Sequence, residues 1–325
     1  MKKAFITGIT GQDGSYLTEL LLDKHYEVHG LIQKSVTPAT SHFQKLSLDE
    51  RYDINKVMLH YGDITDYRSL LKIIKQIQPD EVYHLAAQSD IQISFENPLE
   101  TADINALGSL RVFAAIYNSK CNAKIFNASS RELYGSAPSE YPQNEKTPFH
   151  PESPYAIAKL FAYHCAIFYR NKYGLKIWNG ILYNHESPRR GENFVTRKIT
   201  HGIARIMTGK QKELVLGNLN AMRDWGYAPD YVEAMWLMLQ SKNPDDFIIA
   251  TSEMHSVQEF LDEAMTCAGV RVPVKVSKNF LRISDVNHLC GDYHKAKKIL
   301  GWKPKTTFKK LVRIMMEADM KREGL

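Results

Sequence analysis

The chain has 325 residues, of which 44% are hydrophobic and 24% are charged. This composition supplies a full hydrophobic core and excludes a disordered chain, and a net charge of +6 without a long Lys/Arg run does not favour a nucleic-acid partner. The apolar runs are too short for a signal peptide or a membrane span. The four cysteines lack metal-binding spacing and are typical of free thiols in a reducing compartment. We therefore expect a cytoplasmic protein that binds no membrane and no metal.

Taken in chain order, the first 185 residues alternate between strand-like and helix-like segments. Predicted strands lie at Ala4–Ile6, Val28–Ile32, Val57–His60, Glu81–Ala86, Lys124–Ser129 and Lys176–Leu182. Predicted helices lie at Ser15–Lys24, Tyr67–Gln76, Thr101–Asn118 and Ser153–Tyr173. Strands that are separated by helices are typical of a parallel sheet covered on both faces. The pattern predicts an α/β fold with a Rossmann-type, doubly wound parallel sheet.

The pattern changes after residue 185. The helix-like segments that follow are Val195–Thr208, Tyr231–Leu239, Val257–Cys267 and Phe308–Lys321. We expect residues 186–325 to form mainly a smaller mixed α/β cap, with some segments returning to the sheet. Because no low-complexity linker separates the two halves, they are expected to share an interface.

A glycine loop follows the first strand and opens the first helix. Gly8, Gly11 and Gly14 fit the spacing G-x-x-G-x-x-G. Glycines allow a sharp turn and let phosphates approach bare backbone, and the helix N terminus attracts the pyrophosphate. The expected cofactor contacts in this loop are Gly8, Ile9, Thr10, Gly11, Gln12, Asp13 and Gly14. Residues 1–185 are therefore predicted to be a dinucleotide-binding domain.

The end of the second strand bears on the choice between NAD and NADP. The strand runs into Gln33 and Lys34 and lacks the carboxylate that would bond the ribose 2′-hydroxyl of NAD. Lys34 can face a 2′-phosphate, which favours NADP and leaves NAD open, although a solvated surface lysine fits equally. The next two strand ends offer an acceptor for the adenine amino group and small residues on which the dinucleotide can lie. These further expected contacts are Asp63, Ile64, Leu85, Ala86, Ala87 and Ser89.

Tyr155 and Lys159 share one face of a long predicted helix, because they stand four residues apart. A lysine ammonium favours the phenolate of a nearby tyrosine, which is otherwise a poor base at neutral pH. The same spacing occurs at Tyr52 and at Tyr293, so position decides among the three. Tyr155 alone follows a strand that ends in Ser129 and Ser130 behind a glycine loop. Ser130 can orient the hydroxyl that is oxidised, and Tyr155 and Lys159 can also contact the cofactor.

Longer stretches carry a specific resemblance. They include ITGITGQDGSYL at Ile6–Leu17, NHESPRRGENFVTRKIT at Asn184–Thr200 and LGNLNAMRDWGYAPDYVEAMW at Leu216–Trp236. With the Ser130 and Tyr155 segments, these stretches resemble the GDP-mannose 4,6-dehydratase family of extended short-chain dehydrogenases/reductases. The resemblance is spread over nearly the whole chain.

The resemblance implies a redox-neutral loss of water from a GDP-sugar, with a nicotinamide cofactor that stays bound. Glu132 would take the proton from C5 of the sugar, a step for which elimination needs an extra acid/base group. His185 and Arg190 would contact the cofactor region. The implied substrate-binding residues are Ser89, Arg131, Asn184, Asn193, Lys198, Arg223 and Arg282. A homo-oligomer, either a dimer or a tetramer, is implied through Thr101–Asn118 and Ser153–Tyr173.

The chain departs from the family at several positions. Arg131 replaces a small residue beside Glu132, and it either pairs with Glu132 or points into the sugar pocket. Asp90 replaces a histidine of the family, and Tyr227 replaces a second histidine. Further departures are Pro229, Asp285 and the missing paired arginines between Gln33 and Gln44. Since several of these changes fall near the expected sugar pocket, our hypothesis is a GDP-hexose or GDP-heptose other than GDP-mannose, such as GDP-N-acetylglucosamine or a GDP-manno-heptose, with GDP-mannose itself as the open alternative.

Two other functions fit the same motifs. A dehydrogenase, 4-reductase or epimerase on this scaffold needs Ser130, Tyr155 and Lys159 but not Glu132. A non-catalytic dinucleotide-binding protein needs only the glycine loop, and the retention of all four groups argues against it.

Overall fold

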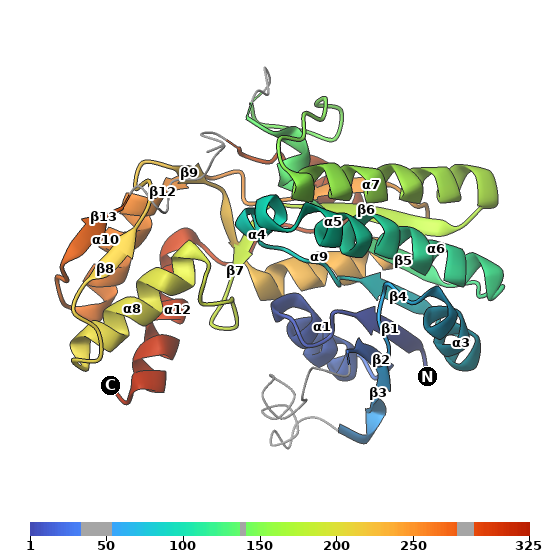
Figure 1. The fold of residues 1–325 in the computed structure, drawn as a ribbon, viewed down its shortest axis with the longest axis horizontal. Helices are drawn as coiled ribbons and strands as arrows, with labels where there is room; N and C mark the ends of the chain where they lie inside the picture. The colour runs from blue at the N-terminus through green and yellow to red at the C-terminus, as the bar shows by residue number, and fades with distance from the viewer. Residues whose placement is uncertain (34–53, 137–140, 278–288) are drawn as a thin grey trace.

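The computed structural model describes residues 1–33, 54–136, 141–277 and 289–325 (Figure 1). Lys34, Arg282 and Asp285 lie outside these ranges, as does most of the segment between Gln33 and Gln44. Within the described ranges, the structure consists of one large parallel sheet with helices on both faces and a smaller mixed lobe at one end.

The central sheet confirms the predicted fold class. Its described strands are β1 (Lys3–Thr7), β2 (Glu27–Ile32), β3 (Val57–Tyr61), β4 (Glu81–His84), β5 (Lys124–Ser130), β6 (Lys176–Leu182) and β11 (Asp246–Ile249). They lie in the order β11-β6-β5-β4-β1-β2-β3, and every neighbouring pair is parallel. The order of strands along the chain reverses between β1 and β4. Ligands of doubly wound sheets bind at this point, beyond the carboxyl ends of the strands.

Helices cover the sheet on both faces. One face carries α1 (Gln12–Asp23) and α9 (Ala228–Gln240), which pack Leu17, Leu21 and Met235 into one apolar cluster. The other face carries α3 (Tyr67–Ile77), α6 (Gly108–Asn118) and α7 (Pro154–Tyr173), whose apolar side chains form a second cluster. The predicted helix Thr101–Asn118 is composite: α5 (Pro98–Ala102) and a π-helical turn (Asp103–Leu107) precede α6. Helix α11 (His294–Leu300) packs near β11.

Local sequence signals explain where helices α7 and α10 begin and end. The Ser153 side chain caps α7 and is followed by Pro154 at the first helical position, while Gly174 ends the helix in a left-handed conformation. In α10 (Val257–Ala268), Ser256 and Glu259 form a capping box, and Gly269 ends the helix. The cap formed by Ser153 and Pro154 sets the N terminus of α7, which follows β5 in the chain.

The smaller lobe combines helices with short two-stranded sheets. Its helices are α8 (Val195–Met207), α10 and α12 (Phe308–Glu323), and its strand pairs are β7 (Asn184–Glu186) with β10 (Trp225–Tyr227), β9 (Met222–Arg223) with β12 (His255–Ser256), and β8 (Leu214–Leu216) with β13 (Val274–Val276). Asp319 is buried on α12 and accepts from Arg197 Nη2 at 2.8 Å and from Thr200 at 2.6 Å, which joins α8 to α12. In the described ranges, no helix combines the length and apolarity needed to cross a bilayer.

Candidate functional site

A cavity of about 880 Å³ opens at the carboxyl edge of the sheet, where β1 and β4 separate. Its walls come from the ends of β1, β2, β4, β5 and β6 on one side and from the smaller lobe on the other. Every expected cofactor or substrate residue in the described ranges lines this cavity, with one exception. The Ile9 side chain is fully buried and packs against Gly30, so Ile9 contributes only its backbone to the loop.

The three glycines of the loop serve different purposes. Gly8 has a φ of +77° and lies so close to β4 that a Cβ would come within 2.8 Å of the Ala86 nitrogen. Gly14 packs directly on the Gly8 carbonyl oxygen. A Cβ at Gly11 would approach only that same oxygen among the described residues, so the Gly11 backbone is exposed to the cavity. In the described structure no side chain caps α1 at Gly11, and its first N–H groups suit a pyrophosphate.

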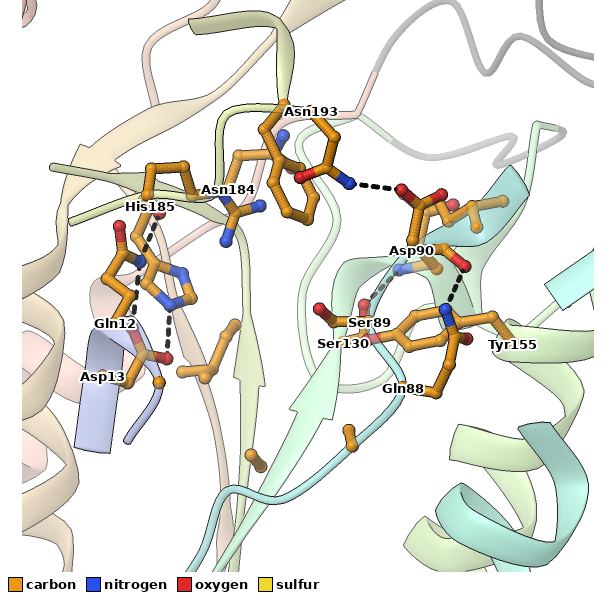
Figure 2. A pocket seen from close by; sticks show the side chains of 18 of the residues that line it. Gln12, Asp13, Gln88, Ser89, Asp90, Ser130, Tyr155, Asn184, His185 and Asn193 are labelled. Carbon is orange, nitrogen blue, oxygen red and sulfur yellow. Dashed lines mark hydrogen bonds and ion pairs between the residues drawn. The ribbon is translucent and has the colours of Figure 1, made fainter. Parts of the chain in front are cut away.

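Ser130, Tyr155 and Lys159 come together at the other end of the cavity. Figure 2 shows the Tyr155 ring beside Ser130. Burial raises the pKa of Tyr155 to about 12, although the hydrogen bond with Ser130 opposes this rise. Burial also lowers the pKa of Lys159 to about 8, and its ammonium donates to the Ala128 carbonyl at 3.0 Å.

Arg131 and Glu132 form an ion pair in the turn that follows β5. Arg131 Nη2 lies 2.6 Å from Glu132 Oε1, and the Arg131 residue is 4% exposed. Arg131 Nη1 is buried and has no hydrogen-bond partner among the described residues. Both side chains line the cavity. The two alternatives that the sequence left open are therefore combined: the guanidinium pairs with Glu132 and also borders the pocket.

Asn193 reaches across the cavity to Asp90. Its side-chain amide donates to Asp90 Oδ2 at 2.5 Å, and Figure 2 shows this bond spanning the two lobes. The other carboxylate oxygen of Asp90 accepts from the Gln92 backbone at 2.8 Å and so caps α4 (Ile91–Glu96). Asp90 thus holds a predicted substrate-binding residue in place from the opposite wall.

The structure adds residues that sequence reasoning missed. Glu186 lines the cavity, accepts from Thr196 at 2.5 Å and lies 3.2 Å from Arg190 Nε. The spacing of four residues between Glu186 and Arg190 was the available signal. Two neighbouring arginines form ion pairs within the protein: Arg189 pairs with Glu19, and Arg197 pairs with Asp319.

Buried polar atoms without partners gather at this cavity. In the described part of the chain, six side-chain N or O atoms are buried and have no hydrogen bond. Four of them belong to residues that line the cavity, namely Ser129, Arg131, Arg190 and Trp225. Arg190 Nε lies near Glu186 but lacks hydrogen-bond geometry. Native proteins rarely leave such groups unpaired, so the cavity is arranged for a polar ligand.

Comparison with known proteins identifies the family. A family model described as GDP-mannose 4,6 dehydratase matches residues 5–315. The chain belongs to the GDP-mannose 4,6-dehydratase family. It is 51% identical to GDP-mannose 4,6 dehydratase 1 of Arabidopsis thaliana, over 98% of this chain and 90% of that protein, and 47% identical to GDP-mannose 4,6 dehydratase of Homo sapiens, over 98% and 91%. The structure of UDP-glucose 4-epimerase from Thermus thermophilus in complex with NAD is similar at a TM-score of 0.84 and 25% identity, covering 98% of both chains.

The departures from the dehydratase family fall into two groups. Arg131 and Asp90 line the cavity. Tyr227 and Pro229 do not. Tyr227 packs its ring edge-on against Tyr16 of α1, with centroids 6.4 Å apart, and Pro229 lies in the first turn of α9. Among the departures in the described ranges, Arg131 and Asp90 are therefore the ones that border the cavity.

A charged pair joins the glycine loop to β7 in this dehydratase-family chain. His185 places Nε2 at 2.7 Å from Asp13 Oδ2 (Figure 2). Its Nδ1 lies 2.7 Å from the Tyr183 carbonyl oxygen. Both partners are acceptors, and a neutral imidazole carries only one N–H, so His185 is the imidazolium. Burial opposes that charge, but the Asp13 carboxylate outweighs burial and raises the pKa of His185. Burial likewise disfavours the Asp13 anion, yet His185 holds the pKa of Asp13 below its usual value.

We expect the stability provided by this pair to disappear at alkaline pH. Because the folded pKa of His185 is raised above 6.5, its contribution is complete below that value and is lost as the pH rises through the folded pKa. Asp13→Asn should therefore lower the free energy of unfolding by about 1.5–3 kcal/mol near pH 6 and by much less at about pH 9. Thermal melts across this pH range measure the difference, with Asp23→Asn on the exposed side of α1 as the control. A loss for Asp13→Asn that does not change with pH would contradict the charged pair.

Proposed function

We propose that this chain is a GDP-sugar 4,6-dehydratase that converts GDP-mannose, or a related GDP-hexose or GDP-heptose, into a GDP-4-keto-6-deoxy sugar. The observation that carries the proposal is the presence of Glu132 in one cavity with Ser130, Tyr155 and Lys159. Oxidation and reduction of a hydroxyl need only Ser130, Tyr155 and Lys159. A carboxylate beside them supplies the base that the removal of water requires.

Each group has a distinct task in the proposed reaction. Tyr155 takes the proton of the sugar C4 hydroxyl, which Ser130 orients, and Lys159 holds the cofactor ribose and supplies positive charge. A nicotinamide dinucleotide held by the glycine loop and Lys159 would supply the redox chemistry at C4 and C6 of the sugar. The C4 ketone acidifies the C5 proton, which Glu132 removes and passes to the C6 hydroxyl, so that this hydroxyl leaves as water. When C6 is reduced, C5 regains a proton from Tyr155, which carries the proton of the C4 hydroxyl. The walls of the smaller lobe, with Asn184, Asn193, Lys198 and Arg223, bind the GDP-sugar.

The cofactor is NADP by preference in this proposal, with NAD as the alternative. The exposed Gly11 backbone and the uncapped N terminus of α1 support dinucleotide binding. At the adenosine end, burial disfavours the Asp63 anion, but hydrogen bonds from Thr65 and Gln33 lower its pKa, so it remains an acceptor. The preference for a 2′-phosphate rests on the sequence position of Lys34.

A homodimer, alone or within a tetramer, is proposed through α6 and α7. Ile157, Phe161 and Phe168 lie on one stripe of α7 and are 57%, 41% and 49% exposed. Tyr117 on α6 is also exposed. Contiguous exposed apolar side chains of this kind mark protein interfaces.

We also propose a reducing, cytoplasmic compartment, which the four free cysteines support.

Glu132→Gln should greatly slow the loss of water but allow oxidation at C4. We expect the dehydration rate to fall by about 100-fold or more, since a positioned acid/base group contributes about 10²–10⁴. The purified protein and the variant are incubated with GDP-mannose, GDP-N-acetylglucosamine and a GDP-manno-heptose, and mass spectrometry follows the loss of water. Glu100→Gln, on an exposed part of α5, is the control. Net consumption of reduced cofactor, or a 4-epimer in place of a dehydrated product, would favour the reductase or epimerase.

Lys34→Ala tests the cofactor preference. If Lys34 faces the 2′-phosphate, this change should weaken NADPH binding by about tenfold or more, because a hydrogen bond to a charged group is worth about 1.5–3 kcal/mol. Affinity for NADH should stay the same. Titration calorimetry measures both constants, with Lys72→Ala on the exposed side of α3 as the control. Equal effects on the two cofactors would remove the basis for the NADP preference.

Phe161→Asp should separate the proposed dimer. A charge at the centre of an apolar stripe cannot be buried without a partner, so the variant should elute with the mass of one chain in size-exclusion chromatography with light scattering. The native protein should show the mass of two chains or of four. Lys309→Asp, exposed on α12, should leave the mass of the native assembly unchanged. A native protein that is monomeric at micromolar concentration would contradict this interface.

A further inference from the structure

Arg131 has an unused donor at the reacting end of the cavity. Its guanidinium is buried at the carboxyl end of β5, directly after Ser130. Nη2 is occupied by Glu132 at 2.6 Å, whereas Nη1 has no hydrogen-bond partner in the described part of the structure. An arginine side chain stays protonated in proteins, so the guanidinium keeps both donors. A buried N–H of a cation that lacks an acceptor is costly, so a bound ligand is expected to provide one.

The rigid shape of the guanidinium limits which ligand oxygen can be that acceptor. The two terminal nitrogens belong to one planar fork and stay next to each other. Because Nη2 is held by Glu132, Nη1 must meet an oxygen close to the carbon from which Glu132 takes a proton. In the proposed reaction, that carbon is C5 of the sugar.

Three oxygens of a hexose lie near C5. The C4 oxygen is met by Ser130 and Tyr155, and the ring oxygen is a weak acceptor. The third is the hydroxyl on C6, which is attached directly to C5. A substituent on C2 lies across the ring and is out of reach of a group that also holds Glu132.

Building on the proposed function, we propose that Arg131 Nη1 donates a hydrogen bond to the C6 oxygen and stabilises it while the C6–O bond breaks. Glu132 takes the C5 proton, and the electrons of the C5–H bond first form the enolate of the C4 ketone and then the C5=C6 double bond. The C6–O bond breaks, and the oxygen leaves as water with the proton that Glu132 carries. Arg131 keeps all its protons and stabilises the negative charge that develops on the leaving oxygen. Donors that are aimed at developing charge make such a contribution in other enzymes.

Arg131→Met separates this role from that of a residue that only positions Glu132. Methionine keeps much of the apolar volume and removes both donors. We expect water loss to fall by about 100-fold or more, as for the removal of one oxyanion donor. Exchange of the C5 proton with D2O, followed by mass spectrometry of the quenched sugar nucleotide, should stay within about threefold of the native rate. A 4-keto sugar nucleotide that still contains its C6 oxygen should accumulate.

A binding measurement tests the same contact without catalysis. The native protein should bind GDP-mannose more tightly than its 6-deoxy analogue, which lacks the C6 oxygen, and Arg131→Met should remove this difference. Arg131→Lys, which retains one charge but lacks the fork, should give an intermediate result. This second variant and the binding cycle keep the inference testable if Arg131→Met folds poorly, as judged by its melting temperature.

The outcomes can be told apart. Equal loss of C5 exchange and of water elimination in Arg131→Met would show that Arg131 only positions Glu132, and would overturn the inference. An unchanged difference between GDP-mannose and its 6-deoxy analogue would overturn it as well. If the native protein removes water from none of the GDP-sugars, the proposed function itself fails, which is a separate result.

Discussion

The parallel pairing of β1 with both β2 and β4 is the constraint on which the site depends. It places β1 in the middle of the sheet, so that the chain must turn away from it on both sides at the same edge. The gap that results receives the glycine loop from one strand and the ends of β4, β5 and β6 from the others. The turn after β1 is tight enough that Gly8 almost touches the backbone of Ala86. A side chain at Gly8 would push β4 away from β1 and open the floor of the cavity.

Charge is distributed along this edge in a way that suits two different ligand parts. Asp13 would repel a pyrophosphate at the N terminus of α1, but His185 neutralises it from the other lobe. The same contact ties the smaller lobe to the loop, since His185 belongs to β7 and stacks on Tyr231 of α9 at 4.6 Å. At the opposite end, Lys159 is buried in the cavity wall, and the hydrogen bond from Asn193 to Asp90 joins the two lobes. The residues that join the two lobes, such as His185 and Asp90, therefore also place charge along the cavity.

The sequence predicts the sheet and its long helices because they carry strong periodic patterns and clear caps. It predicts α7 almost to the residue, since Ser153, Pro154 and Gly174 mark both ends. It misses β11 and the two- and three-residue strands of the smaller lobe, because segments this short show no periodicity. The hydrogen bond from Asn193 to Asp90 joins residues 103 positions apart, and no local signal reveals it. The direction of the Arg131 side chain likewise depends on tertiary packing. The sequence alone leaves open whether this side chain pairs with Glu132 or points into the pocket.

Stability alone does not explain why Arg131 and Glu132 are buried together. Removing both charges from water costs several kcal/mol for each ion, and well-packed apolar residues in place of a buried pair are often as stable or more so. The cost is increased further here, because one guanidinium nitrogen has no acceptor in the described structure. In the proposed reaction, hydride transfer uses the glycine loop, Tyr155 and Lys159 and does not need this pair. Arg131 and Glu132 stand in the single turn after β5, beside Ser130. In that reaction the turn adds the groups for elimination to a scaffold for oxidation, and a substrate oxygen that accepts from Arg131 Nη1 would offset part of the energetic cost of the pair.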